Sequence, residues 1–199
     1  LNVNNFVSAD SITLTAPTIN LLSGDAQAVN DAIATGSAIN IGAGMAGMAR
    51  LTGANVLLRG ATEGTGTLNL NGGVEAKSGN LEFNLGGINA YGGGLFAPVD
   101  IVGFVTGDIL LGGGAYIHAG NDVRLTERGT TSLLSMSSGG HVLAGMPTTI
   151  HLDFPNRDTS GVVTDGSPGS GLFVVVNGGG TPATPGNGLE LTLRPVLTP

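Results

Sequence analysis

Short runs of alternating apolar and polar residues recur along the whole chain and limit what it can fold into. Clear examples are residues 12–15, 68–71, 81–85, 150–154 and 189–193. In a β-strand, successive side chains point to opposite faces, so each run would bury its aliphatic residues and expose Thr, Asn or Glu. Gly, Asn or Asp bound the runs. The pattern therefore predicts many short, half-buried strands joined by tight turns.

The spacing of these runs suits two architectures. The run centred on Leu68 is followed by one centred on Leu81, and the run at Ile109 is followed by one at Val123. A short strand at about every 12 to 14 residues is compatible with a β-sandwich or with a β-solenoid.

Three features favour the solenoid. Glycine pairs and triplets separate the runs, as corners with positive φ require, and they stand at 72–73, 86–87, 92–94 and 112–114. Outward positions are rich in Asn and Thr, which can form ladders between coils. The chain has no Trp, two Tyr and six Phe, whereas sandwich cores use larger side chains. We expect an all-β chain folded as a parallel β-helix, with the sandwich as the alternative.

The alternation also predicts which side chains form the core. The inward set comprises Ile12, Leu14, Ile19, Leu21, Ile39, Ile41, Leu68, Leu70, Leu81, Phe83, Leu85, Ile109, Leu111, Val123 and Leu125.

Residues 25–34 are the one segment with a helical signature. Asp25 is a candidate N-cap, Val29, Ala32 and Ile33 are spaced as on one helix face, and Gly36 would end the helix. A short helix over one end or flank of the solenoid is predicted here, with a loop as the alternative.

After residue 150 the sequence becomes rich in turn-forming residues, so we divide the chain into a solenoid rod, 1–150, and a loop-rich C-terminal β segment, 151–199, that serves as cap or assembly segment. A flexible Gly/Pro linker at 178–186 precedes the last strand. That strand either covers its own rod or pairs with a neighbouring molecule. The candidate assembly residues are Leu172, Phe173, Val174, Val175, Val176, Leu189, Leu191 and Leu193.

Charge and composition exclude several classes of partner. The net charge of −7 leaves no basic stripe for nucleic acid. The longest apolar stretch, 99–117, is interrupted by Asp100 and Asp108, so no membrane insertion is expected. The absence of Cys removes disulfides, thiolate metal sites and thiol nucleophiles. Because the chain begins at Leu1 and carries no signal peptide, we interpret it as a processed product or a fragment.

Three phrases carry a resemblance to a known family. Residues 9–16, 106–111 and 119–126 resemble the degenerate repeats of filamentous-haemagglutinin-like large exoproteins, which are the exported partners of two-partner secretion systems. The resemblance covers roughly residues 8–145. It implies a right-handed parallel β-helix rod, secretion to the bacterial cell surface, and a role in adhesion or biofilm. The family's secretion domain, with its Asn-Pro motifs, is not found in this sequence, so the resemblance does not give the export route.

Two motifs suggest ligands but fit solenoid corners better. Residues 42–47 match the Gly-x-Gly-x-x-Gly dinucleotide fingerprint, but another short strand, rather than a helix, is predicted to follow. Residues 120–122 resemble part of a calcium-binding nonapeptide repeat, but only one copy is present and Arg124 would oppose a cation. We interpret both as turns.

The remaining polar residues show no arrangement typical of catalysis or metal binding. His118, His141 and His151 lack metal-ligand spacing, and the serines near His141, which are Ser135, Ser137 and Ser138, lack an acidic partner. Lys77 is the only lysine, so a β-elimination site is not expected. A calcium ion among the loop carboxylates of Asp153, Asp158 and Asp165, and an ice-binding ladder at Thr13 and Thr15, are weaker alternatives.

These observations predict a secreted or cell-surface structural or adhesive β-solenoid that self-associates into filaments or matrix. No catalytic residues, metal site or cofactor are expected. A surface glycan or a host receptor is the expected external partner. The alternative is a carbohydrate-binding or carbohydrate-cleaving β-helix protein, which would need a groove with exposed aromatic side chains.

Overall fold

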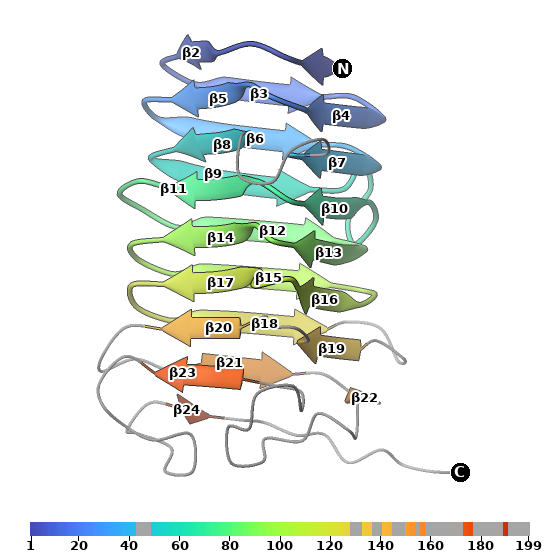
Figure 1. The fold of residues 1–199 in the computed structure, drawn as a ribbon, viewed down its shortest axis with the longest axis vertical. Coiled ribbons are helices and arrows are strands. Elements are labelled where there is room, and N and C mark those ends of the chain that lie inside the picture. The colour runs from blue at the N-terminus through green and yellow to red at the C-terminus, as the bar shows by residue number, and fades with distance from the viewer. Residues whose placement is uncertain are drawn as a thin grey trace.

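The computed structural model describes residues 1–42, 49–127 and six short strands beyond them, and it contains strands but no helix in those parts. The strands form three parallel sheets, and in each sheet the strands are stacked one after another along the same long axis (Figure 1). We name them sheets A, B and C. Sheet A contains β1 (Asn2–Val3), β4 (Thr18–Leu21), β7 (Ala38–Ile41), β10 (Thr67–Leu70), β13 (Gly87–Tyr91), β16 (Ile109–Gly112), β19 (Leu133–Met136) and β22 (Asn156–Arg157).

The other two sheets have the same number of strands. Sheet B contains β2 (Val7–Ala9), β5 (Asp25–Ala28), β8 (Arg50–Gly53), β11 (Gly73–Ala76), β14 (Gly94–Ala97), β17 (Tyr116–Ala119), β20 (His141–Ala144) and β23 (Phe173–Val176). Sheet C contains β3 (Ile12–Thr15), β6 (Asp31–Thr35), β9 (Asn55–Arg59), β12 (Leu81–Leu85), β15 (Ile101–Val105), β18 (Val123–Glu127), β21 (Ile150–Asp153) and β24 (Leu189–Glu190). Consecutive strands thus visit sheets A, B and C in turn, which confirms the parallel β-solenoid.

One coil is longer than the sequence spacing suggests. Ile19 pairs in register with Ile39, and Leu68 pairs in register with Ile88. The closer spacing of Leu68 and Leu81 crosses from sheet A to sheet C and passes over β11. A coil therefore has three strands, and the spacing seen in the sequence separates two of its faces rather than successive strands.

The predicted core is confirmed, with one residue half-buried. Every member of the inward set except Leu14 is buried. Leu14 is partly buried and packs against the core. It belongs to β3, which pairs only with β6 and is the last strand of sheet C at this end. Its second side therefore lacks the neighbouring coil that covers the same position in β6.

At one position inside the solenoid, a large side chain lies beside a glycine of the next coil. Phe83 of β12 is 1% exposed, and it is in register with Gly103 of β15. A Cβ on Gly103 would lie on the Phe83 ring, because the ring occupies that space. The aromatic side chain fits because its neighbour in the next coil has no side chain.

The helix predicted at 25–34 is wrong, since these residues form β5 and β6. Ala26, Ala28, Ala32 and Ala34 are all buried and alternate with residues that are exposed or partly exposed. Alanine has the highest helix propensity, but here it fills the narrow interior at positions of period two. Pairing with both neighbouring coils outweighs the local preference.

Beyond residue 127 the described strands continue the same sheets. β21 pairs with β18, β23 with β20, and β24 with β21, all parallel. The division at residue 150 thus falls at the first residue of β21. That the segment after it forms a separate cap or assembly unit stays a prediction.

Candidate functional site

The outer face of sheet A carries a ladder of five asparagines, one on each successive coil. Side-chain amides donate from Asn20 to Asn2, Asn40 to Asn20 and Asn69 to Asn40, each at 2.7 Å. Asn89 donates to Asn69 at 3.2 Å. The predicted outward ladder is confirmed here for Asn. Because each of the three inner amides donates to one coil and accepts from the next, the ladder links the coils.

A second ladder runs along the corner before sheet C. The Asn55 amide donates to Asp31 at 3.0 Å, and the side-chain oxygen of Asn55 accepts from the backbone N–H of Asn80 at 3.1 Å. In the next two coils, the backbone N–H of Asp100 donates to the Asn80 side-chain oxygen at 3.2 Å, and the backbone N–H of Asp122 donates to the Asp100 carboxylate at 3.1 Å. These side chains satisfy backbone donors that a tight corner would leave unpaired. The carboxylates of Asp31 and Asp100 therefore accept hydrogen bonds that hold the corner together.

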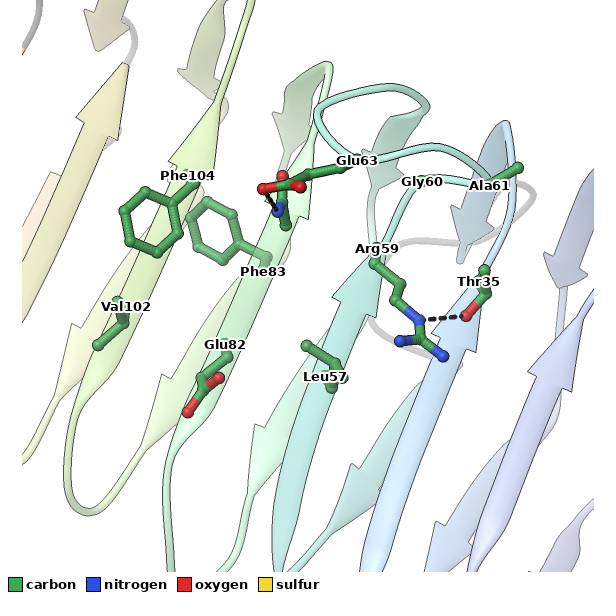
Figure 2. Close-up of a pocket in the computed structure, with 11 residues that line it drawn as sticks. Thr35, Leu57, Arg59, Gly60, Ala61, Glu63, Glu82, Phe83, Val102 and Phe104 are labelled. Carbon is green, nitrogen blue, oxygen red and sulfur yellow. Dashed lines mark hydrogen bonds between the residues drawn. The ribbon is translucent and has the colours of Figure 1, made fainter. Parts of the chain in front are cut away.

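The outer face of sheet C is hollowed into a cleft of about 550 Å³. Leu57 of β9 and Val102 and Phe104 of β15 line it, and residues 60–63 stand over one side (Figure 2). Glu82 of β12 lies in register between Leu57 and Val102. A smaller hollow of about 220 Å³ adjoins it and shares Leu57 and Glu82. Both volumes together extend along β6, β9, β12 and β15.

Hydrogen bonds fix the loop over this cleft. The Asn84 amide donates to Glu63 at 3.1 Å, and its oxygen accepts from the backbone N–H of Gly64 at 3.0 Å. The Thr106 hydroxyl donates to the Gly64 carbonyl at 2.6 Å. Arg59 donates to the Thr35 hydroxyl at 3.0 Å, as Figure 2 shows. The polar groups of the cleft thus largely bind one another.

The outer face of sheet B has a second groove, of about 320 Å³. Its central column reads Arg50, Gly73, Gly94, Tyr116 in register across four coils. The Tyr116 ring lies on Gly94, since a Cβ there would overlap the ring atoms. The Arg50 side chain extends over Gly73, where a Cβ would be 3.4 Å from the arginine Cγ. Backbone therefore forms the floor between the two side chains.

The next outward column completes this groove. Glu75 and Phe96 are in register and line it. The Phe96 ring meets the His118 imidazole edge to face, with centroids 5.3 Å apart and an interplanar angle of 79°. Such a pair holds both rings in place. An arginine, a carboxylate and two aromatic rings thus surround a floor of glycine backbone.

The nucleotide motif at 42–47 is followed by a strand. Gly42 has φ of 77° and follows β7, and β8 begins at Arg50; residues 43–48 lie outside the described residues. The next described element is thus a strand of sheet B and not the helix that a dinucleotide site requires.

In the partial calcium repeat, the carboxylate of Asp122 is paired with an arginine. The Arg124 guanidinium forms an ion pair with Asp122 at 2.9 Å. No group of three or more His, Asp or Glu side chains placed to hold a metal ion occurs among the described residues. Asp158 and Asp165 lie outside them, and the side chains of Asp153, His141 and His151 are not described, nor are those of Ser135, Ser137 and Ser138. Thr13 and Thr15 point outward from β3, but their register partners Ile33 and Thr35 do not repeat the pair.

The predicted assembly residues fall on two described strands. Phe173, Val174, Val175 and Val176 form β23, and Leu189 begins β24, while Leu172, Leu191 and Leu193 lie outside the described residues. Both strands pair with the preceding coil of the same chain. Their role in assembly stays a prediction.

The groove on sheet B is not anticipated by the sequence patterns. Those patterns assign Gly73 and Gly94 to corners, but each opens a strand, and neither has a positive φ. A glycine inside a strand, where its conformation does not require it, often marks a close approach of another group. That signal is present in the sequence, but assigning it requires the register that places Arg50 and Tyr116 beside the two glycines.

No family model, no curated protein and no solved structure matches this chain. In the part of the chain that the structure describes, no helix has the length and hydropathy needed to cross a membrane.

Proposed function

We propose that this chain is a secreted or cell-surface structural and adhesive β-solenoid that self-associates into extracellular filaments or matrix. The observation that carries the proposal is the continuous register of three parallel sheets, in which each coil is a template for the next. Stability accumulates along such a rod, because each added coil packs on the one before it. The resemblance to filamentous-haemagglutinin-like exoproteins supports the adhesive and surface role.

The first coil supports self-association. In the structure, β1, β2 and β3 each pair on one side only. Leu1, Phe6 and Val7 are exposed at this end by 53%, 62% and 41%. Unpaired strand backbone together with apolar side chains favours the addition of another coil by the same parallel pairing. A coil of the same polypeptide or of a second copy would extend the rod in the same way.

The C-terminal strands are the proposed second contact. β24 follows a Gly/Pro linker, and such a linker lets a strand pair with its own rod or with a neighbour. Leu189, Leu191 and Leu193 would fill apolar positions on the receiving edge.

Two measurements test this function. Negative-stain images of the purified chain should show rods joined into fibres, and dispersed compact particles would contradict self-association. Deletion of residues 178–199 should disperse the fibres into single rods if the last strand crosses between molecules. Increased light scattering after the deletion would identify that strand as a cap instead. A matched control replaces only the linker 178–186 with a Gly/Ser sequence of equal length, which should leave either behaviour unchanged.

A further inference from the structure

From the groove on sheet B, which contains Arg50, Glu75, Phe96 and Tyr116 over a glycine floor, we infer a binding site for a neutral hexose unit of a glycan. The inference rests on the adhesive role proposed above and names the class of ligand for it.

The first step is the shape of the floor. Between Arg50 and Tyr116 the outward column holds only Gly73 and Gly94. Adjacent strands lie roughly 4.8 Å apart, so the two residues are separated by about 14 Å of backbone along the rod axis. Their side chains lie over that interval, but a volume of about 320 Å³ remains open. This is at the lower end of the range of about 300–1,000 Å³ for small-ligand pockets, which suits one or two sugar rings.

The second step is the charge of the groove. Its described lining contains one cation, Arg50, and one anion, Glu75. The two charges cancel in the net charge of the groove, so neither an anionic nor a cationic ligand is favoured over a neutral one. A guanidinium supplies only donors and a carboxylate only acceptors. A ligand with several hydroxyl groups satisfies both at once, because each hydroxyl donates and accepts.

The third step is the pair of aromatic rings. The two rings that line this groove, Phe96 and Tyr116, belong to neighbouring strands of sheet B, β14 and β17. One face of a hexose presents a patch of C–H groups, which packs on an aromatic ring while the hydroxyls point sideways to polar groups. Tyr116 is 36% exposed. Its ring is held against Gly94, so it is positioned before a ligand arrives.

The cleft on sheet C is a poorer candidate for this ligand. Its Arg59 and Glu63 are hydrogen-bonded to Thr35 and Asn84, respectively. A ligand there would have to displace contacts that already satisfy these groups. In the groove on sheet B, no hydrogen bond or ion pair joins the side chain of Arg50 or Glu75 to another described residue.

The test is saturation-transfer NMR on the full chain with methyl glucoside, methyl galactoside and methyl mannoside as probes, and with glucuronate and choline as charged comparisons. We expect transfer to the ring C–H protons of at least one methyl hexoside and weaker transfer to both charged compounds. Glu75→Gln and Arg50→Gln should each weaken binding about tenfold, since hydrogen bonds to charged groups contribute at least that factor. Tyr116→Ala should weaken it similarly.

Tyr91→Ala is the matched control, because Tyr91 is the other tyrosine, is 57% exposed and does not line the groove. Binding unchanged in Tyr91→Ala but lost in Tyr116→Ala, with equal melting temperatures, supports the site. Gly73→Ala provides a second variant that fills the floor without removing a polar group, and it too should weaken binding.

Absence of transfer to all three hexosides overturns the inference, as does stronger transfer to glucuronate or choline, or equal losses in Tyr91→Ala and Tyr116→Ala. None of these results bears on fibre formation, which the imaging of deletion variants measures separately. Failure of the glycan site and failure of the filament proposal are therefore distinguishable.

Discussion

The outer faces of sheets A and B are built on the same coils but follow opposite rules. On sheet A, Asn recurs at one register position from Asn2 to Asn89, and each side chain bonds to the next. On sheet B the corresponding column changes at almost every coil, from Asp25 through Arg50 and glycine to Tyr116. The ladder satisfies its own polar groups, whereas in the varied column the side chain of Arg50 has no hydrogen bond or ion pair to another described residue. We infer that a residue repeated on every coil of an outer face stabilises the fold, and that a non-repeating column is a candidate binding surface.

Both faces share one core, and its loss sets the largest expected effect. Phe83→Ala removes a ring that is 1% exposed and packs on Gly103. We expect it to lower the free energy of unfolding by about 3–5 kcal/mol, as for other buried aromatic residues replaced by alanine. The shift in urea midpoint, at constant m-value, measures this. A change under about 0.5 kcal/mol would mean that the ring is not part of the core.

The sequence predicts this core because burial follows a period of two that needs no knowledge of the coil. Of the inward set, only Leu14 is half-buried rather than buried. The segment 25–34 misleads because alanines at buried strand positions also satisfy helix propensity. The groove on sheet B is beyond sequence reasoning, because coils of unequal length hide the register: the chain from Asn40 to its partner Asn69 is much longer than the chain from Asn69 to Asn89.

The ladder on sheet A gives the next largest effect. Asn40→Ala removes a donor to Asn20 and an acceptor from Asn69, both at 2.7 Å. Because its neighbours lose partners at a half-buried position, we expect a loss of about 2 kcal/mol by urea denaturation. Glu75→Ala is the matched control at an outward position of sheet B, and should change stability by no more than about 0.5 kcal/mol. Equal losses in the two variants would remove the distinction between the faces.

A smaller loss of stability is expected on sheet B, where the ring of Tyr116 packs on Gly94. Gly94→Ala places a Cβ on top of ring atoms of Tyr116, so the ring must move outward. We expect a loss of about 1 kcal/mol, the lower end of overpacking costs, since an outer ring can shift more freely than a buried one. Thermal melting with near-ultraviolet circular dichroism follows both stability and the tyrosine environment. An unaltered tyrosine signal would contradict the contact.

The smallest effect is predicted one coil away, at Gly73. A Cβ there would meet Arg50 Cγ at 3.4 Å, which is ordinary contact with a flexible side chain, and Gly73 has no positive φ. Gly73→Ala should therefore change the free energy of unfolding by less than about 0.5 kcal/mol, and its lower entropy in the unfolded chain offsets any crowding. Urea denaturation of Gly73→Ala and Gly94→Ala side by side measures the difference between two adjacent glycines of one column. If Gly73→Ala is as destabilising as Gly94→Ala, this glycine is required by the strand itself. If it is neutral, as we expect, stability does not account for a glycine at this position.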